Sequence, residues 1–225
     1  MFAKHKALVL AAALLAGGAA QAQVALTADA GTTGAGVHLV VPMETYLNGR
    51  FGVNGFNHNF TKQSGPVDYD IKGKLQTADI LFDWYLREGS AFHLTGGIVY
   101  NNNHFNAVAK PSALGNFSLN GNTYTAADVG LLSGDIQFRK AAPYLGIGWG
   151  NALADTARRW QFSAELGTFF EGDPKVHLVS IGCATSNAVC KAVATDVAAE
   201  QAKLQGDMSG YRFYPVARAS VSYRF

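Results

Sequence analysis

The 225-residue sequence has little charge and, apart from residues 7–20, no long apolar run. Charged residues make up 15% of it, whereas soluble globular domains carry about 25%. Hydrophobic residues make up 48%, which is too many for a disordered chain. After residue 22, no segment reaches the ~18 consecutive apolar residues of a membrane-spanning helix. The composition therefore fits neither an ordinary soluble domain nor a helical membrane protein.

Residues 1–22 have the form of a secretory signal peptide. A short basic head with Lys4 and Lys6 precedes the apolar stretch, and Ala20-Gln21-Ala22 fits a small-residue cleavage site. A membrane anchor is the alternative, but the stretch is shorter than the ~18–20 residues that a spanning helix needs. We expect cleavage after Ala22 and one domain over residues 23–225. The exported chain is then periplasmic, secreted or located in the outer membrane.

The sequence also contains few cysteines and has little net charge. Two cysteines cannot form a disulfide scaffold or a cysteine-rich zinc module, and 18 basic against 16 acidic residues give no electrostatic footprint for nucleic acid. After export, Cys183 and Cys190 are expected to form a disulfide. Their spacing alone does not indicate a metal site. We expect no metal, no other cofactor and no nucleic-acid partner.

The exported chain alternates between apolar residues and polar or small ones. This period of two predicts half-buried strands, at residues 24–30, 36–42, 49–60, 68–86, 91–101, 141–150, 160–170 and 216–225. A soluble sandwich would bury the apolar set in a core, whereas a membrane barrel turns that set to lipid and the polar set to the lumen. The low charge favours the barrel, as do aromatic residues near the ends of the segments. Those aromatic residues are Trp84, Tyr100, Trp149, Trp160, Tyr223 and Phe225.

We therefore expect an all-β fold, an eight-stranded antiparallel up-and-down transmembrane β-barrel with long extracellular loops and a short helix. An even number of strands is the rule for bacterial barrels. Short turns at residues 43–48, 87–90 and 152–159 are expected on the periplasmic side. The longer polar segments 61–67, 102–135 and 175–209 are expected as outer loops. Thr195–Met208 is predicted to be the helix, with Thr195 as its N-cap.

Two resemblances point to the bacterial outer membrane. Arg218, Tyr223 and Phe225 resemble the C-terminal signal that the barrel-assembly machinery reads, although Ser220 stands where glycine is usual. Residues 75–101 and 143–150, with Tyr214-Pro215, resemble small proteobacterial outer-membrane barrels, similar in architecture to the outer membrane protein A and W types. The resemblance implies a monomer in the outer membrane. Its partners would be membrane lipid, lipopolysaccharide and the assembly machinery.

Six ionisable residues fall on the inward set: Asp29, Arg50, Asp83, His93, Glu165 and Arg218. His38 and Arg224 are further candidates. These residues form either a polar pore or a proton-linked site, or else an internal salt-bridge network that fills a narrow lumen. The network is favoured because the interior of an eight-stranded barrel is just wide enough for side chains, and buried charges must be paired. Such a network could still open as a gate.

An enzyme that modifies lipid A is the least favoured function. Barrel deacylases of this kind pair a histidine with a serine two residues on, but Asn106 holds that position after His104. No G-x-S-x-G motif is present either. We therefore expect no catalytic residues and a structural or surface-interaction role. The alternative is a narrow channel for small molecules, including hydrophobic ones.

Overall fold

The computed structural model describes residues 23–64, 67–111, 115–154 and 157–225, so that the signal peptide expected over residues 1–22 lies outside the described residues. Within them, eight antiparallel strands close into a ring. They are β1 (Ala25–Gly31), β2 (Gly34–Glu44), β3 (Leu47–Ser64), β4 (Val67–Tyr85), β5 (Phe92–Asn101), β10 (Ala141–Trp149), β11 (Trp160–Phe170) and β13 (Phe213–Arg224). β1 pairs with β13, and β5 pairs with both β4 and β10. The ring confirms the expected eight-stranded barrel.

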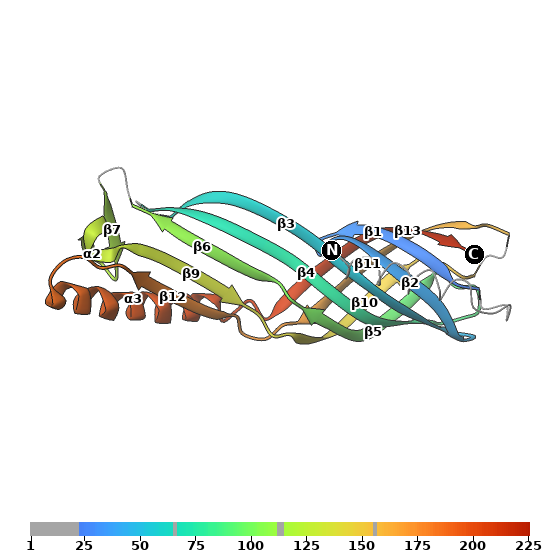
Figure 1. Ribbon diagram of the computed structural model, residues 1–225. Coiled ribbons are helices and arrows are strands. Elements are labelled where there is room, and N and C mark those ends of the chain that lie inside the picture. Colours follow the sequence, from blue (N-terminus) through green and yellow to red (C-terminus); the bar gives the residue numbers. More distant parts are fainter. Residues whose placement is uncertain (1–22, 65–66, 112–114, 155–156) are drawn as a thin grey trace, which may run out of the picture.

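Three strands continue the sheet beyond one end of the ring (Figure 1). β6 (His104–Lys110) follows β5 along the outer part of β4, β9 (Leu131–Gln137) pairs with β6, and β12 (Lys175–Ile181) pairs with β9. A hairpin of β7 (Asn116–Leu119) and β8 (Asn122–Thr125) lies here with α2 (Ala126–Val129) and α3 (Asn187–Met208). We call residues 102–140 and 171–212, with the outer parts of β3 and β4, the outer shell. The C-terminus lies at the opposite end of the molecule (Figure 1).

The outer segments are more ordered than the sequence indicated. The stretches expected as loops contain β6, β7, β8, β9 and β12, and the β3–β4 hairpin continues to Ser64 and Val67. Extending the sheet gives the backbone groups of these segments hydrogen-bond partners. The helix begins at Asn187 rather than Thr195, because the Ser186 side chain accepts a hydrogen bond from Val189 N and caps it. Thr195 lies inside the helix and donates to the Lys191 carbonyl.

The ring is apolar on its outside. Leu145, Phe162 and Leu166 are 71%, 78% and 62% exposed, whereas the inward neighbours Tyr144 and Glu165 are buried. Monomeric soluble proteins rarely leave so wide an apolar surface in water, so the outer face of the ring faces lipid. Among the described residues, no helix combines the length and the apolar character needed to cross a membrane.

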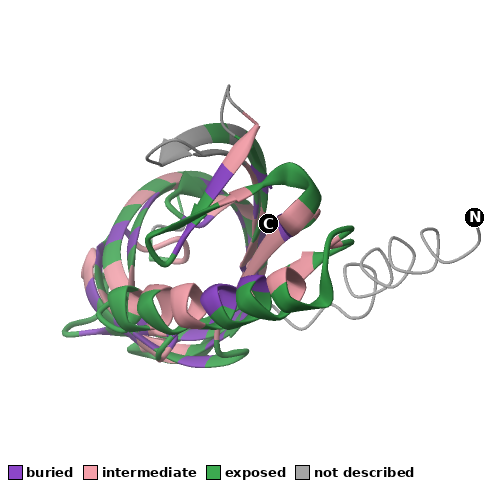
Figure 2. Ribbon diagram, turned by 90° about the vertical axis from the view of Figure 1, so that its left-hand side faces the viewer, coloured by how far each residue is buried: buried purple, intermediate pink, exposed green. Residues whose placement is uncertain are grey.

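The shell instead has an apolar core of its own. Phe117, Val129, Leu132, Val193 and Val197 form its core, contributed by β7, α2, β9 and α3. Seen along the ring, α3 lies across one side of the opening (Figure 2). The shell is thus a small water-facing domain built on strands that extend out of the membrane.

α3 covers the free edge of β12. Val176 N and Leu178 N donate to the side-chain oxygens of Gln205 and Gln201, at 3.0 and 2.9 Å. Residues four apart on a helix are ~6 Å apart along its axis, close to the ~6.8 Å between alternate strand residues. The two glutamines therefore match the two unpaired amides and protect an edge that could otherwise pair with another chain.

Candidate functional site in the barrel lumen

The six ionisable residues expected inside the barrel are all buried there. They come from six strands: Asp29 from β1, Arg50 from β3, Asp83 from β4, His93 from β5, Glu165 from β11 and Arg218 from β13. Of the two further candidates, His38 from β2 is buried among them, and the structure adds Asp79 from β4, which is also buried. Arg224 lies apart from this group, and its Nη1 is 3.5 Å from Gln23 Oε1.

One half of the network is centred on Arg50. Its Nη2 lies 3.1 Å from Asp83 Oδ1 and also donates to Glu165. The Tyr144 hydroxyl from β10 donates to Glu165, and the Thr95 hydroxyl from β5 donates to Asp83 at 2.8 Å. A single guanidinium group therefore holds two carboxylates that belong to opposite walls of the ring.

The other half is centred on His38. Its Nδ1 lies 2.7 Å from Asp29 Oδ2, and its Nε2 lies 3.0 Å from Asp79 Oδ1. Arg218 contacts the same two carboxylates, at 3.4 and 3.6 Å. Arg218 Nη1 is also 3.8 Å from Glu165 Oε1, which joins the two halves. With Thr95 and Tyr144 included, every strand of the ring contributes to one connected network.

The geometry at His38 decides the charge balance. An ionised carboxylate only accepts hydrogen bonds, so two carboxylates facing both ring nitrogens require a hydrogen on each nitrogen. This arrangement favours the imidazolium form of His38 beside the guanidinium groups of Arg50 and Arg218. Among the described network residues, four carboxylates therefore face two guanidinium groups and the His38 ring, with His93 4.0 Å from Asp83. Buried charges are tolerable when they are paired in this way.

An apolar layer in the lumen was not predicted from the sequence. Leu81, Val99, Ala142, Tyr144, Phe169 and Val216 are buried together on the inward face. The alternation predicts an inward set of polar or small residues, and Leu81, Val99 and Phe169 interrupt that pattern. Beyond this layer Glu171 is buried, and one of its oxygens accepts from Asn101 Nδ2 at 2.9 Å. Burial raises the pKa of Glu171 to about 7, although the hydrogen bond from Asn101 favours the ionised form.

The lumen leaves little empty space around the network. A cavity lined by Arg50, Asp83, Tyr85, His93 and Glu165, among others, has a volume of about 20 Å³. A single water molecule needs about 10–15 Å³ on this measure, so the cavity holds about one. The described side chains therefore fill this part of the lumen.

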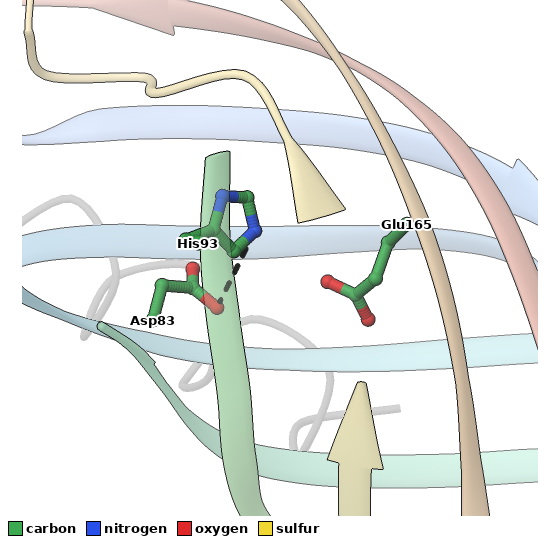
Figure 3. Close-up of side chains that lie close together, drawn as sticks. All are labelled: Asp83, His93 and Glu165. Atoms are coloured by element: carbon green, nitrogen blue, oxygen red, sulfur yellow. Dashed lines mark ion pairs between the residues drawn. The ribbon is translucent and has the colours of Figure 1, made fainter. Parts of the chain in front are cut away.

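Asp83, His93 and Glu165 are the described residues best placed to hold a metal ion (Figure 3). Their ligand atoms lie within 4.8 Å of one another. Arg50, however, already bonds both carboxylates. A cation would have to displace this guanidinium group, so we assign the three residues to the charge network.

The other predicted site residues lie away from the lumen network. Cys183 and Cys190 form a disulfide with their Cα atoms 5.8 Å apart, joining the turn before α3 to its first turns. Tyr223 packs against Trp160 and Phe225, with ring centroids 4.9 and 5.2 Å apart. Arg218 points into the lumen, so it does not share a surface with these two aromatic residues.

A lipid-facing ring of eight strands around a paired ionic interior defines an integral β-barrel of the bacterial outer membrane. Among solved structures, the chain is similar to CarO2 of Acinetobacter baumannii, with a TM-score of 0.58 and 20% identity over 91% of this chain and 99% of that one. CarO of the same organism gives a TM-score of 0.56 and 22% identity over 90% and 98%. A major outer membrane protein of Thermus thermophilus gives 0.40 and 16%, over 91% and 100%.

At these identities the likeness to CarO2 and CarO establishes the fold alone. No protein-family model matches the chain, and no curated protein matches its sequence. The finer resemblance to the outer membrane protein A and W types is therefore a prediction that these comparisons leave open.

Proposed function

We propose that this protein is a monomeric, non-enzymatic barrel that serves a structural role in the outer membrane and presents its shell to partners at the cell surface. The observation that carries the proposal is the lumen network, in which ion pairs and hydrogen bonds together connect all eight strands. Such a network stabilises a closed ring and leaves about one water of free space beside it.

The interaction role is supported by an apolar patch on the outward face of the shell. Val108, Leu131, Val179 and Ile181 are all exposed there. Leu131 lies opposite Ile181, and Ser133 lies between Val108 and Val179 in the sheet. These residues belong to the part of the sheet that extends beyond the ring, so membrane lipid does not cover them. Exposed apolar patches of this kind often mark contact sites.

The second candidate is a narrow channel for small molecules, including hydrophobic ones. It is favoured by the apolar layer of the lumen, because the buried side chains of Val99 and Phe169 would line the path of a hydrophobic solute once this packed layer opened. Opening such a channel would require the Arg50 and Arg218 ion pairs to separate.

Planar-bilayer recording of the refolded protein separates the two candidates. We expect no discrete openings, because the network has to break before ions can pass. A matched recording of Arg50→Gln provides the control, since removal of the central guanidinium group should produce openings if the network is the barrier. Discrete openings in the unsubstituted protein would overturn the structural role in favour of the channel.

Two further parts of the proposal have their own tests. For the absence of enzyme activity, mass spectra of lipid A from cells with and without the protein are expected to be identical, and a mass change would refute it.

We also propose that the assembly machinery recognises Tyr223 and Phe225. Replacing both with alanine should then lower the amount of barrel in the membrane, whereas replacing Trp160 alone should not.

A further inference from the structure

A groove on the outward surface marks the boundary between the lipid-facing ring and the shell. It has a volume of about 870 Å³ and is lined by residues of β2, β3, β4 and the end of β5. Its outward members on the ring side are apolar, and they include Val37, Val53, Ala78 and Tyr100. Val37, Val53 and Tyr100 are each about half exposed.

The shell side of the groove is polar and cationic. Asn57, Lys74, Gln76 and Asn102 line it, and none of the described lining residues is acidic. Asn102 Nδ2 donates to Gln76 Oε1 at 3.0 Å, and Lys140 Nζ donates to Asn102 Oδ1 at 2.6 Å. The Lys74 ammonium group and the amides of Gln76 and Asn102 thus line the groove beside its apolar floor, and Lys140 lies next to the groove, where it contacts Asn102.

The same cationic character continues around the sheet at this level. Lys74 lies opposite His104 in the pairing of β4 with β6, and His104 lies opposite Gln137 of β9. Gln137 in turn lies opposite Lys175 of β12. Lys74, His104, Gln137 and Lys175 therefore lie side by side across four strands, next to the lipid-facing part of the sheet, with a lysine at each end. Lys72 lies two residues from Lys74 on the same face, farther from the ring.

We propose that this groove binds a phosphorylated glycolipid of the outer leaflet, lipopolysaccharide, with an acyl chain on the apolar floor and a phosphate between Lys74 and Lys140. The amides of Gln76 and Asn102 match sugar hydroxyls or phosphate oxygens. Two lysines at the polar boundary match the negative charge of the lipid headgroup. The proposal rests on the barrel's place in the membrane and not on the state of its lumen, so a conducting lumen would leave it unaffected.

The test uses the full-length refolded protein in detergent micelles and purified lipid A in two forms, with and without its phosphates. We expect the phosphorylated form to bind more tightly. The double variant Lys74→Gln/Lys140→Gln should lose about tenfold in affinity for it. Lys191→Gln/Lys203→Gln on α3 removes the same charge away from the groove and should stay within about twofold. Heat-modifiable migration on a gel verifies that each variant is folded.

A second pair of variants tests the apolar floor. A Cβ atom at Gly55 would lie 3.7 Å from the Leu75 carbonyl oxygen, an ordinary contact that the backbone accepts. Gly55→Leu should therefore fill the groove and weaken lipid A binding, while Gly55→Ala should leave it nearly unchanged. Equal affinity for the two lipid A forms, or unchanged affinity in both the lysine and the Gly55→Leu variants, would overturn the proposal.

Discussion

The ring and the shell are parts of one sheet, but their polarity is opposite. β4 passes through both parts. On its outward face, Trp84 and Ile80 are exposed apolar residues in the ring, whereas Lys72 is exposed in the shell. On its inward face, Asp83 is buried in the ring, and half-buried Ile71 takes its place in the shell.

The difference teaches that the solvent around a strand, and not its backbone, decides which face is apolar. In lipid the outer face must be apolar, so the ring has an ionic network where a soluble barrel has a core. In water the shell returns to the usual arrangement, with Phe117 and Val193 buried inside. The two parts should therefore respond differently to substitutions at their centres.

Arg50→Met should have the largest effect, because it leaves Asp83 and Glu165 buried without their guanidinium group. Breaking a buried ion pair from one side costs about 3–5 kcal/mol, and we expect a loss of this size in the free energy of unfolding. Urea titration followed by gel mobility measures it. Arg87→Met, in the exposed turn before β5, is the control and should change stability by less than about 0.5 kcal/mol. Equal stability of the two variants would mean that the network does not stabilise the ring.

Glu171, at the junction of ring and shell, should make stability depend on pH. Its pKa is raised from 4.5 to about 7 in the folded protein. The folded state therefore holds the proton over a range in which the unfolded chain has lost it, and stability falls as pH rises through this range. Glu171→Gln should abolish this component, which is about 1–2 kcal/mol after allowing for solvent screening. Urea midpoints of both proteins at about pH 5 and about pH 9 measure it, and parallel pH profiles would contradict the assignment.

The alternation was sufficient to predict the ring. Lipid on one side and side chains on the other impose a period of two, and each expected segment overlaps an observed strand. The same alternation placed Asp29, Arg50 and Glu165 inside. Asp79 was missed although it lies four residues before Asp83 and so shares its face. Glu165 and Arg218 lie opposite each other in the pairing of β11 with β13, so their contact follows from the register of neighbouring strands. The contacts of Arg50 with Glu165 and of His38 with Asp79 could not be predicted, since they join strands that are not adjacent in the ring.

The shell was largely missed for a physical reason. Residues 175–181 alternate, with Val176 and Leu178 inward, but the polarity of the faces is reversed relative to the ring. The partners of this strand lie about 40 residues earlier in the chain, and those of β6 lie on two separate strands. Such non-local pairings leave no local signal. The earlier start of the helix, at Asn187 rather than Thr195, has a simpler cause: Ser186 and Thr195 are both favourable N-cap residues, and Ser186 takes the role.

Gln201→Ala should have the smallest effect and should be confined to the shell. The substitution removes the acceptor of Leu178 N on the free edge of β12, and one neutral hydrogen bond contributes about 1 kcal/mol. We expect faster hydrogen exchange at Leu178 and along α3, with the urea midpoint of the ring unchanged. Lys203→Ala, on an exposed part of the same helix, is the matched control and should leave the exchange at Leu178 as it is. If Gln201→Ala shifted the ring and the shell together, the two parts would unfold as one unit, and their opposite polarity would not make them energetically separate.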